Sequence, residues 1–460
     1  MDNITLIEIL NATKGKVIKE GKEVPYEAVS IDTRTIVENS IFIALKGANF
    51  NGNSFLREAS YKGARVCIID ELCDELISVN DNVFVIKVED GKQALLDLAK
   101  YYRKKLKIKV IGITGSTGKT STKDLVAGAL SSKYRVFKTK GNFNNEIGLP
   151  LMIFNITNEY DIAVLEMGMS NFGEIHNLTD VARPDIAIIT NIGVSHLEYL
   201  KTRENILKAK LEITDYFDDF NSLIINNDND LLKTIKSKSF NIVKTGMEDS
   251  TDDFYVKHYK LHEDMVNFVV NENSENKDYE FNINIIGKHN ISNALLAIAC
   301  GRKLGLSYDD LQEGFRKIEF TSMRLDIIKG EKFTLIDDSY NASPDSMKAA
   351  IDVLESIEGK RKIAVLGTMK ELGNEAFNLH KEVGEYAKLR NIDLLLCVGE
   401  FEEAYKKGFV SDKKIINFSS NEGVCEYLES NILQGDCVLV KASRSMKFET
   451  IVNKLKTINC

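Results

Sequence analysis

The feature that most constrains the fold is a glycine-rich stretch, GITGSTGKTST, at residues 112–122. It follows an apolar run that predicts a buried strand over 108–114, and it leads into a predicted helix over 119–133. A glycine-bent loop between a strand and a helix N-terminus directs backbone N–H groups at anionic oxygens. Lys119 can then reach a β- or γ-phosphate, and the Thr120 hydroxyl can bind Mg²⁺. The stretch therefore predicts a nucleotide-phosphate site.

The match is to the shorter pattern TGxxGKT, because Ile113 stands where the longer GxxxxGK[ST] pattern has glycine. The alternative is a structural turn with an incidental lysine, which the strand–loop–helix context disfavours. The chain has no Asn-Lys-x-Asp motif of the kind that switch GTPases use to bind the base. The absence of this motif argues against a switch GTPase and leaves other nucleotide-dependent enzymes as alternatives.

The rhythm of predicted elements divides the chain into three α/β domains. Residues 1–86 carry short alternating segments, typical of a small mixed domain. Residues 87–320 alternate apolar strands with amphipathic helices, which predicts a central doubly wound ATPase domain, interrupted by hairpin-like segments at 251–288. The alternation restarts over 321–460 and predicts a Rossmann-like C-terminal domain. We expect the three domains to meet around a cleft.

Composition excludes several classes of function. The 460 residues carry a formal net charge of −8, which argues against a nucleic-acid-binding surface as the main function. No apolar run approaches the roughly 20 residues of a membrane span. The N-terminus lacks the basic and apolar segments of a signal peptide, so we expect a cytoplasmic protein. Seven scattered cysteines, none with CxxC spacing, favour reduced thiols over disulfides or zinc.

One lysine falls on an apolar helix face. In the helix predicted over 202–217, Lys210 shares a face with Ile206, Ile213 and Phe217. Burial lowers the pKa of a lysine and leaves some neutral amine. Such an amine can take up CO₂ and become a carbamate, an oxygen ligand for a hard cation such as Mg²⁺. On the pattern alone, the favoured alternative is a lysine that lies along the domain edge with its ammonium group in water.

Two further candidate ligands follow predicted strands. Glu166 ends one strand and His196 comes just after another. Ligands bind outside the carboxyl ends of strands in such sheets. Both residues are therefore candidates for holding a second metal, and on position alone an ordinary loop role is equally favoured.

Taken together, the ordered motifs resemble those of the Mur ligases, the ATP-dependent enzymes that extend the peptidoglycan stem peptide. The motifs are TGSTGKTS, GNFNNEIGLP, LEMGMSNFGEI, NIGVSHLEYL, GKHNISNALLAIA, MRLDII, IDDSYNASPDSM, VLGTMKELG and VKASRSM. The resemblance covers nearly the whole chain. Within the family, NFNNEIGLP, DDSYNASPDSM and GTMKELG are most similar to the branch that adds D-alanyl-D-alanine to UDP-N-acetylmuramoyl-tripeptide. The N-terminal segment SIDTRTIVENSIFIALKGANFNGNSF is similar to the family's nucleotide-sugar-binding segment.

The resemblance implies a reaction and a set of partners. ATP would activate the tripeptide carboxylate as an acyl phosphate, with Mg²⁺ at two sites, and the dipeptide amine would then attack. Residues 1–86 would bind the UDP-sugar, 87–320 the ATP, and 321–460 the incoming D-Ala-D-Ala. These small molecules would be the partners of an enzyme of peptidoglycan precursor synthesis. We expect a monomer, although the sequence alone does not give the oligomeric state.

The resemblance also implies roles for individual residues. The nucleotide-binding residues would be Thr114, Gly115, Ser116, Thr117, Gly118, Lys119, Thr120, Asn290, Asn293, Arg324 and Asp338. The catalytic residues would be Lys119, His196, Lys210 and Arg324. The metal ligands would be Thr120, Glu166, His196 and a carbamylated Lys210. The substrate-binding residues would be Ser30, Asp32, Arg34, Lys46 and Asn51 for the nucleotide sugar, Asn144 and Asn145 for the tripeptide, and Asn341 for the dipeptide.

Departures and alternatives remain. Thr368 stands where the family often has Asp, which can alter dipeptide contacts, and Ala442 stands where Gly is common. A DNPR segment, which marks the diaminopimelate-adding relatives, is absent. The alternatives are a sister Mur ligase, a folylpolyglutamate-synthase-like ligase, a small-molecule kinase and a nucleotide-dependent binding module. The sequence leaves open whether residue three of the tripeptide is lysine or diaminopimelate.

Overall fold

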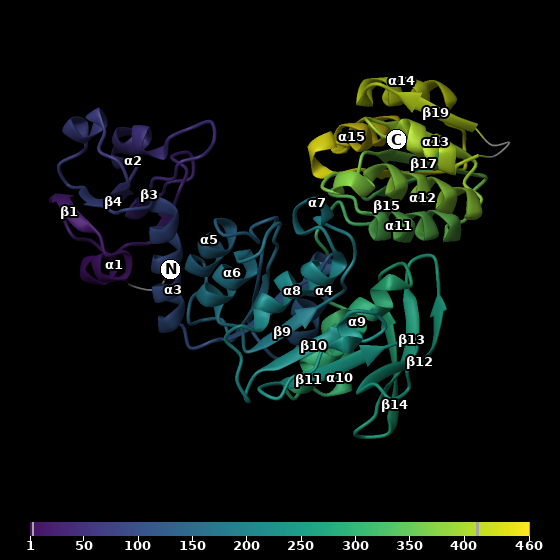
Figure 1. Ribbon diagram of the computed structural model, residues 1–460, viewed down its shortest axis with the longest axis horizontal. Coiled ribbons are helices and arrows are strands. Elements are labelled where there is room, and N and C mark those ends of the chain that lie inside the picture. The colour runs from purple at the N-terminus through teal and green to yellow at the C-terminus, as the bar shows by residue number, and fades with distance from the viewer. Residues whose placement is uncertain (2–3, 411–413, 460) are drawn as a thin grey trace. The chain divides into compact units, whose positions relative to one another are not determined.

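The computed structural model (Figure 1) describes residues 1, 4–410 and 414–459. These residues divide into two compact units. The first unit comprises Met1–Thr114, Lys133–Ala187 and Leu211–Ser222, and the second comprises Gly115–Ser132, Ile188–Lys210 and Leu223–Cys460. The three domain boundaries predicted from the sequence stay a prediction. No helix in the described residues has both the length and the apolar character needed to cross a membrane.

The first unit contains α-helices, 3-10 helices and most of the N-terminal strands. Its α-helices are α1 (Leu6–Thr13), α2 (Leu56–Tyr61), α3 (Gly91–Lys105), α5 (Gly148–Phe154) and α6 (Glu174–Ala182), and its 3-10 helices are η1 (Gly52–Phe55), η2 (Asp74–Ser78) and η3 (Glu212–Thr214). Its strands are β1 (Lys16–Lys19), β2 (Ala28–Ser30), β3 (Ser40–Ile43), β4 (Ala64–Ile69), β5 (Phe84–Lys87), β6 (Lys109–Thr114), β7 (Val136–Lys138) and β8 (Ile162–Glu166). Strands β9 (Ile186–Ile189) and β10 (Ser222–Asn226) begin in the first unit and end in the second.

Parallel pairing dominates the first unit. A five-stranded sheet has the order β1-β5-β4-β3-β2, in which β1 alone pairs antiparallel. Strand β8 pairs in parallel with β6 and with β7. Strands β6 and β8 are buried along almost their entire length, which is why their sequences are continuous apolar runs rather than alternating ones.

The second unit holds the remaining elements. Its helices are α4 (Lys119–Leu130), α7 (Leu197–Leu200), α8 (Arg203–Leu211), α9 (His289–Lys303), α10 (Tyr308–Phe315), α11 (Pro344–Ser356), α12 (Ala376–Leu389), α13 (Glu402–Gly408), α14 (Asn421–Asn431) and α15 (Glu449–Ile458). Its strands are β11 (Asn241–Gly246), β12 (Phe254–Leu261), β13 (Val266–Glu272), β14 (Lys277–Ile283), β15 (Asp326–Lys329), β16 (Phe333–Asp337), β17 (Arg361–Gly367), β18 (Leu394–Val398), β19 (Lys414–Phe418) and β20 (Asp436–Lys441).

Two kinds of sheet occur in this unit. Strands β12, β13 and β14 pair antiparallel, which confirms the hairpins predicted within 251–288. A six-stranded sheet has the order β15-β16-β20-β17-β18-β19, parallel except for β15. The doubly wound C-terminal sheet predicted from the alternation is therefore confirmed.

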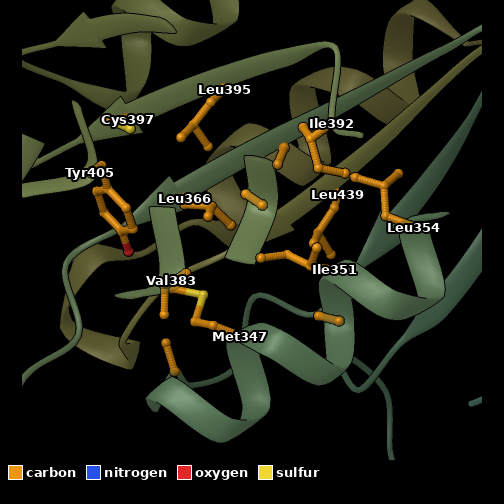
Figure 2. Close-up of a cluster of buried hydrophobic side chains, with 14 of the residues drawn as sticks. Met347, Ile351, Leu354, Leu366, Val383, Ile392, Leu395, Cys397, Tyr405 and Leu439 are labelled. Atoms are coloured by element: carbon orange, nitrogen blue, oxygen red, sulfur yellow. The ribbon is translucent and has the colours of Figure 1, made fainter. Parts of the chain in front are cut away.

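Helices cover both faces of this C-terminal sheet because successive strand residues point to opposite sides. Figure 2 shows Leu366, Leu395 and Leu439 of the sheet together with Met347 and Ile351 of α11 in one buried cluster. Their strand neighbours enter a second cluster, which includes Val365, Leu396, Val438 and residues of α14 and α15. Each such side chain contributes about 1.5–3 kcal/mol when it is fully buried. The carboxyl edge of the sheet is thus held on a rigid support.

One predicted helix is shorter than expected. The pattern predicts a helix over 202–217, but α8 ends at Leu211 and a 3-10 turn covers Glu212–Thr214. The carboxylate of Glu212 accepts hydrogen bonds from the backbone N–H groups of Gly173 and His176 at the start of α6. These contacts favour the tighter turn over continued helix, and the periodicity of the sequence carries no sign of them.

Candidate active site

The phosphate loop runs from the end of β6 to the start of α4. Gly118 adopts φ = 77°, the left-handed conformation that glycine tolerates best, and α4 begins directly after it without a capping side chain. A Cβ atom on Gly115 would lie 1.8 Å from Oγ1 of Thr190. Both glycines are therefore required by the loop geometry. An uncapped helix N-terminus of this kind binds anionic oxygens.

The neighbouring segment 190–193 holds the loop in shape. The amide of Asn191 accepts a hydrogen bond from Thr117 N–H at 2.8 Å and donates one to Thr117 Oγ1 at 2.6 Å. Thr190 donates its hydroxyl to the carbonyl of Thr117, and Ser116 Oγ accepts from Gly193 N–H at 2.9 Å. Thr190 and Asn191 were not among the predicted site residues. Their signal was the polar pair TN at the end of an apolar strand.

Two lysines lie near the loop with different surroundings. Nζ of Lys119 donates a hydrogen bond to the carbonyl of Gly115 at 2.7 Å. Lys210 is 1% exposed, so its amine does not extend into water and the domain-edge alternative is wrong. Burial, and secondarily the charge of Lys119, holds the pKa of Lys210 well below its usual range. The neutral amine is the form that reacts with CO₂.

Glu166 lies in the first unit at the carboxyl end of β8 and is almost completely buried. Its Oε1 accepts a hydrogen bond from Nδ2 of Asn144 at 2.8 Å, and its N–H donates to Oγ1 of Thr139. The structure therefore brings Glu166 together with one of the two predicted tripeptide residues. The other, Asn145, instead accepts hydrogen bonds from Ile147 and Gly148 N–H at the start of α5.

His196 has a left-handed backbone, φ = 63°, at the start of α7. Its Nδ1 lies 2.5 Å from Oε2 of Glu371, in a close contact that lacks the alignment of a hydrogen bond. The imidazole is the main cause of a lowered pKa at Glu371. With Nδ1 held against this carboxylate, Nε2 is the nitrogen that remains available for a metal.

The predicted nucleotide-binding asparagines lie on one face of α9 beside the phosphate loop. Nδ2 of Asn293 donates to Oδ1 of Asn290 at 2.9 Å, and Nδ2 of Asn290 donates to the carbonyl of Ile286. A Cβ atom on Gly118 would lie 2.8 Å from Oδ1 of Asn293. Helix α9 therefore brings both asparagines to the loop that their predicted ligand would occupy.

The predicted C-terminal residues gather where β16 and β20 end. The guanidinium of Arg324 lies 4.2 Å from the ring centre of Tyr340, and its Nε is buried without a hydrogen-bond partner. Nζ of Lys441 lies 2.5 Å from Oδ2 of Asp338 and donates to the carbonyl of Asn341 at 2.9 Å. Arg324, Asp338 and Asn341 thus share one small polar cluster.

Lys441 is a residue that sequence reasoning missed. It ends the buried strand β20, and burial lowers its pKa although the Asp338 carboxylate opposes the shift. Its signal was a lysine at the end of the apolar run DCVLVK. One ammonium group fixes both the predicted nucleotide contact and the loop of the predicted dipeptide contact.

The nucleotide-sugar residues form two groups in the first unit. Ser30 Oγ lies 2.9 Å from Thr35 Oγ1, and Asp32 pairs with Arg34 at 2.5 Å, which lowers the pKa of Asp32 to about 2. Lys46 and Asn51 face each other across a β-bridge, and both contact the carboxylate of Glu71, at 3.1 Å each.

The two departures from the family pattern are both buried. Oγ1 of Thr368 accepts a hydrogen bond from Glu400 N–H at 3.1 Å, so this side chain supports the turn after β18. Ala442 fits tightly against Gly367, because a Cβ atom on Gly367 would lie 2.6 Å from the Cβ atom of Ala442. The effect predicted for Thr368 on dipeptide contacts stays a prediction.

Comparison with known proteins gives matches along nearly the whole chain. The Mur ligase family, catalytic domain, matches residues 25–103; the Mur ligase middle domain matches 113–301; and the Mur ligase, glutamate ligase domain, matches 323–444. The UDP-N-acetylmuramoyl-tripeptide–D-alanyl-D-alanine ligase of Bacillus subtilis (strain 168) is 40% identical over 433 residues, covering 93% of this chain and 92% of that protein. The chain belongs to the Mur ligase family.

Solved structures agree with this assignment. MurF from Acinetobacter baumannii matches with a TM-score of 0.90 and 28% identity, covering 99% of both chains. MurF from Thermotoga maritima, solved in complex with ADP, matches with a TM-score of 0.81 and 29% identity, covering 94% of this chain and 97% of that one. The three-domain α/β fold class and the ATP-dependent ligase class predicted from the sequence are confirmed.

The candidate donor residues suit a metal ion that is held partly by substrate and water rather than by protein side chains alone. Among the described residues, no three His, Cys, Asp or Glu side chains form a group that could hold a metal ion. Mg²⁺ is commonly held by one or two carboxylates together with substrate phosphates and water. A carboxylate, a hydroxyl and a carbamate on Lys210 would suit that preference, and the role of each residue remains a prediction.

Proposed function

We propose that this chain is an ATP-dependent ligase that joins D-alanyl-D-alanine to UDP-N-acetylmuramoyl-tripeptide in peptidoglycan precursor synthesis. The observation that carries the proposal is the near full-length similarity to ligases with that activity, at 40% identity for the Bacillus subtilis protein. The phosphate loop, which hydrogen bonds from residues 190–193 hold in shape, agrees with this proposal because the reaction consumes ATP. We propose further that the enzyme acts in the cytoplasm as a monomer.

The phosphate loop serves to activate a carboxylate. An oxygen of the tripeptide carboxylate attacks the γ-phosphorus of ATP, and ADP leaves. The resulting acyl phosphate has phosphate as its leaving group, whereas a free carboxylate would have to expel oxide. Both reactants are anionic, so neutralisation of charge is the main task of the protein. Lys119 on the loop and Arg324 in the C-terminal cluster are the cations proposed for it.

The second step forms the amide bond. The free amine of D-Ala-D-Ala attacks the acyl carbon, the tetrahedral intermediate expels phosphate, and the nitrogen loses a proton. Asn341 is proposed to contact the dipeptide, and the Lys441–Asp338 pair fixes its loop. Water must be excluded from the acyl phosphate, which would otherwise hydrolyse. Closure of the C-terminal domain over the bound ATP is proposed to exclude it and to deliver Arg324.

Mg²⁺ would supply charge neutralisation on the phosphates. The residues proposed to hold it are Thr120, Glu166, His196 and Lys210 as a carbamate. The burial of Lys210 and its lowered pKa support the carbamate, because only the neutral amine reacts with CO₂. The remaining proposed residues bind the substrates. They are Ser30, Asp32, Arg34, Lys46 and Asn51 for the nucleotide sugar, and Asn144 and Asn145 for the tripeptide.

One assay tests the proposal. Purified protein is incubated with ATP, Mg²⁺, UDP-N-acetylmuramoyl-tripeptide and candidate amines, and products are identified by mass. We expect a product only with D-Ala-D-Ala or a close dipeptide analogue, with one ADP and one phosphate released per bond. Using tripeptides that contain lysine or diaminopimelate identifies the accepted third residue. Preference for a single amino acid would assign the chain to a sister ligase, and a stable phosphorylated product would indicate a kinase.

A further inference from the structure

Helix α4, which begins at the phosphate loop, carries a buried pair of charges that the proposed reaction does not use. Lys123 and Asp124 have side chains that are each 1% exposed, and Nζ of Lys123 lies 3.3 Å from Oδ1 of Asp124. Burying a charged side chain is costly unless the charge is paired and hydrogen-bonded. Packing alone does not explain a buried pair of charges one turn after Lys119.

The pair holds a residue that is distant in the sequence. The N–H of Thr321 donates to Oδ2 of Asp124 at 2.9 Å, and Nζ of Lys123 donates to Oγ1 of Thr321 at 3.2 Å. The hydroxyl and the backbone N–H of Thr321 are therefore both bound by α4, across 198 and 197 residues of sequence. Either charge alone could make only one of these two contacts.

Thr321 lies in the connection between α10 and β15, three residues before Arg324. Three residues span at most about 10 Å, so the anchor limits where Arg324 can lie. The path is further restricted because Met323 and Leu325, on either side of Arg324, have left-handed backbones with φ of 62° and 52°. Leu325 N–H in turn donates to Asp338, at 3.3 Å. A short, sharply bent segment thus joins the phosphate-loop helix to the C-terminal cluster.

We propose that Lys123 and Asp124 are positioning residues that anchor Thr321 to the phosphate-loop helix and thereby set the reach of Arg324 toward the bound nucleotide. This inference rests on the proposed ligase function for the role of Arg324. The anchor leaves the residues after Thr321 able to move when the C-terminal domain closes, while their starting point stays fixed on the helix that holds the phosphates. Lys123 and Asp124 contact none of the three substrates in this proposal.

The test removes one hydroxyl and leaves the buried pair intact. Thr321→Val keeps the shape of the side chain and the backbone N–H bond to Asp124 but loses the bond from Lys123. Ser322→Ala, at the exposed neighbouring position, is the matched control. Thermal unfolding establishes that each variant folds. Lys123→Met, which keeps length without charge, is a second variant if Thr321→Val is poorly produced.

Two measurements are made on each variant. The first is the rate of tryptic cleavage in the connection, after Arg316, Lys317 or Arg324, which needs no substrate. A hydrogen bond from a charged group is typically worth a factor of about ten or more, so we expect cleavage of Thr321→Val to be at least about tenfold faster than that of the unmutated protein. The second is ligase kinetics, in which kcat should fall by a similar factor with little change in KM for ATP.

The outcomes separate the inference from the proposed function. Faster cleavage with lower kcat in Thr321→Val, and neither change in Ser322→Ala, would support the anchor. Unchanged kcat in a folded Thr321→Val would overturn it, whether or not cleavage is faster, because the contact would then only stabilise the fold. If the unmutated protein ligates no amine, the proposed function fails on its own, and unchanged cleavage would still refute the anchor independently.

Discussion

Replacing Lys210 by methionine distinguishes a buried amine from a metal-binding carbamate. Removing a buried amine should raise the stability of the protein, whereas removing a carbamate that binds metal should lower its activity. Methionine has nearly the length of lysine and no charge. Lys210 is 1% exposed, and its lowered pKa is caused mainly by burial. Burying a polar group without a compensating partner costs about 1–3 kcal/mol. In the protein without bound substrates, Lys210→Met should therefore raise the free energy of unfolding by up to about that amount.

Activity should change in the other direction. If Lys210 carries a carbamate that contributes negative charge at the metal, its loss removes an interaction of the kind worth about 2.7–4 kcal/mol in other active sites. This corresponds to a fall in kcat of roughly 10²- to 10³-fold. Short carboxylic acids should restore part of the activity of Lys210→Met by supplying the missing oxygen ligands. Activity of the unmutated protein should also depend on bicarbonate after CO₂ is stripped.

The assays are chemical denaturation of the apoprotein and ligation measured at saturating ATP. Lys208→Met is the matched control, because Lys208 lies on the same helix with an exposed side chain. It should leave stability and kcat close to those of the unmutated protein. A stable Lys210→Met with near-normal kcat, or full activity of the unmutated protein without CO₂, would refute the carbamate.

Three further changes test other parts of the structure. Lys119→Ala removes a phosphate-binding cation and should lower kcat/KM by orders of magnitude with the fold intact; near-normal turnover would show that the loop is not the ATP site. Gly115→Ala places a Cβ atom 1.8 Å from Oγ1 of Thr190, so it should weaken ADP binding measured by calorimetry, whereas unchanged affinity would contradict the loop geometry. Burial is the main cause that raises the pKa of Asp252 to about 6. In the unfolded chain the carboxyl group of Asp252 has a pKa of about 3.9, so the folded state binds the proton more tightly. The protein therefore loses stability as the pH rises from about 4 through 6. Asp252→Asn should thus stabilise the protein by about 1–3 kcal/mol at pH 7.5 and by little at pH 4, and an effect independent of pH would refute this account.

Much of the fold could be predicted because parallel strands buried on both faces are continuous apolar runs. Strands β17, β18 and β20 appear in the sequence as KIAVLG, DLLLCV and CVLVK, separated by amphipathic helices. The phosphate loop could be predicted because its glycines are required by backbone geometry, as Gly118 shows with its positive φ. Local chemistry of this kind is written directly into neighbouring residues.

The contacts that sequence reasoning missed join residues that are far apart. The hydroxyl and amide of Thr190 and Asn191 shape a loop more than 70 residues earlier, and Lys441 binds Asp338 across 103 residues. The end of α8 at Leu211 depends on a carboxylate that binds the start of α6. No periodicity within a segment records such partners, because each of them depends on the tertiary fold.

His380 illustrates how a tertiary contact outside the site bears on it. It is completely buried on α12, where Nδ1 lies 2.6 Å from the carbonyl of Ala376 and Nε2 accepts a hydrogen bond from Met369 N–H at 2.8 Å. A carbonyl only accepts and a backbone N–H only donates, so these partners require the neutral tautomer with its proton on Nδ1. Burial correspondingly lowers the pKa of His380 to about 4. One imidazole thus fixes the loop after β17, which carries Glu371, the partner of His196. The position of Glu371, and through it that of the proposed metal ligand His196, therefore depends on the hydrogen bond between Met369 and His380.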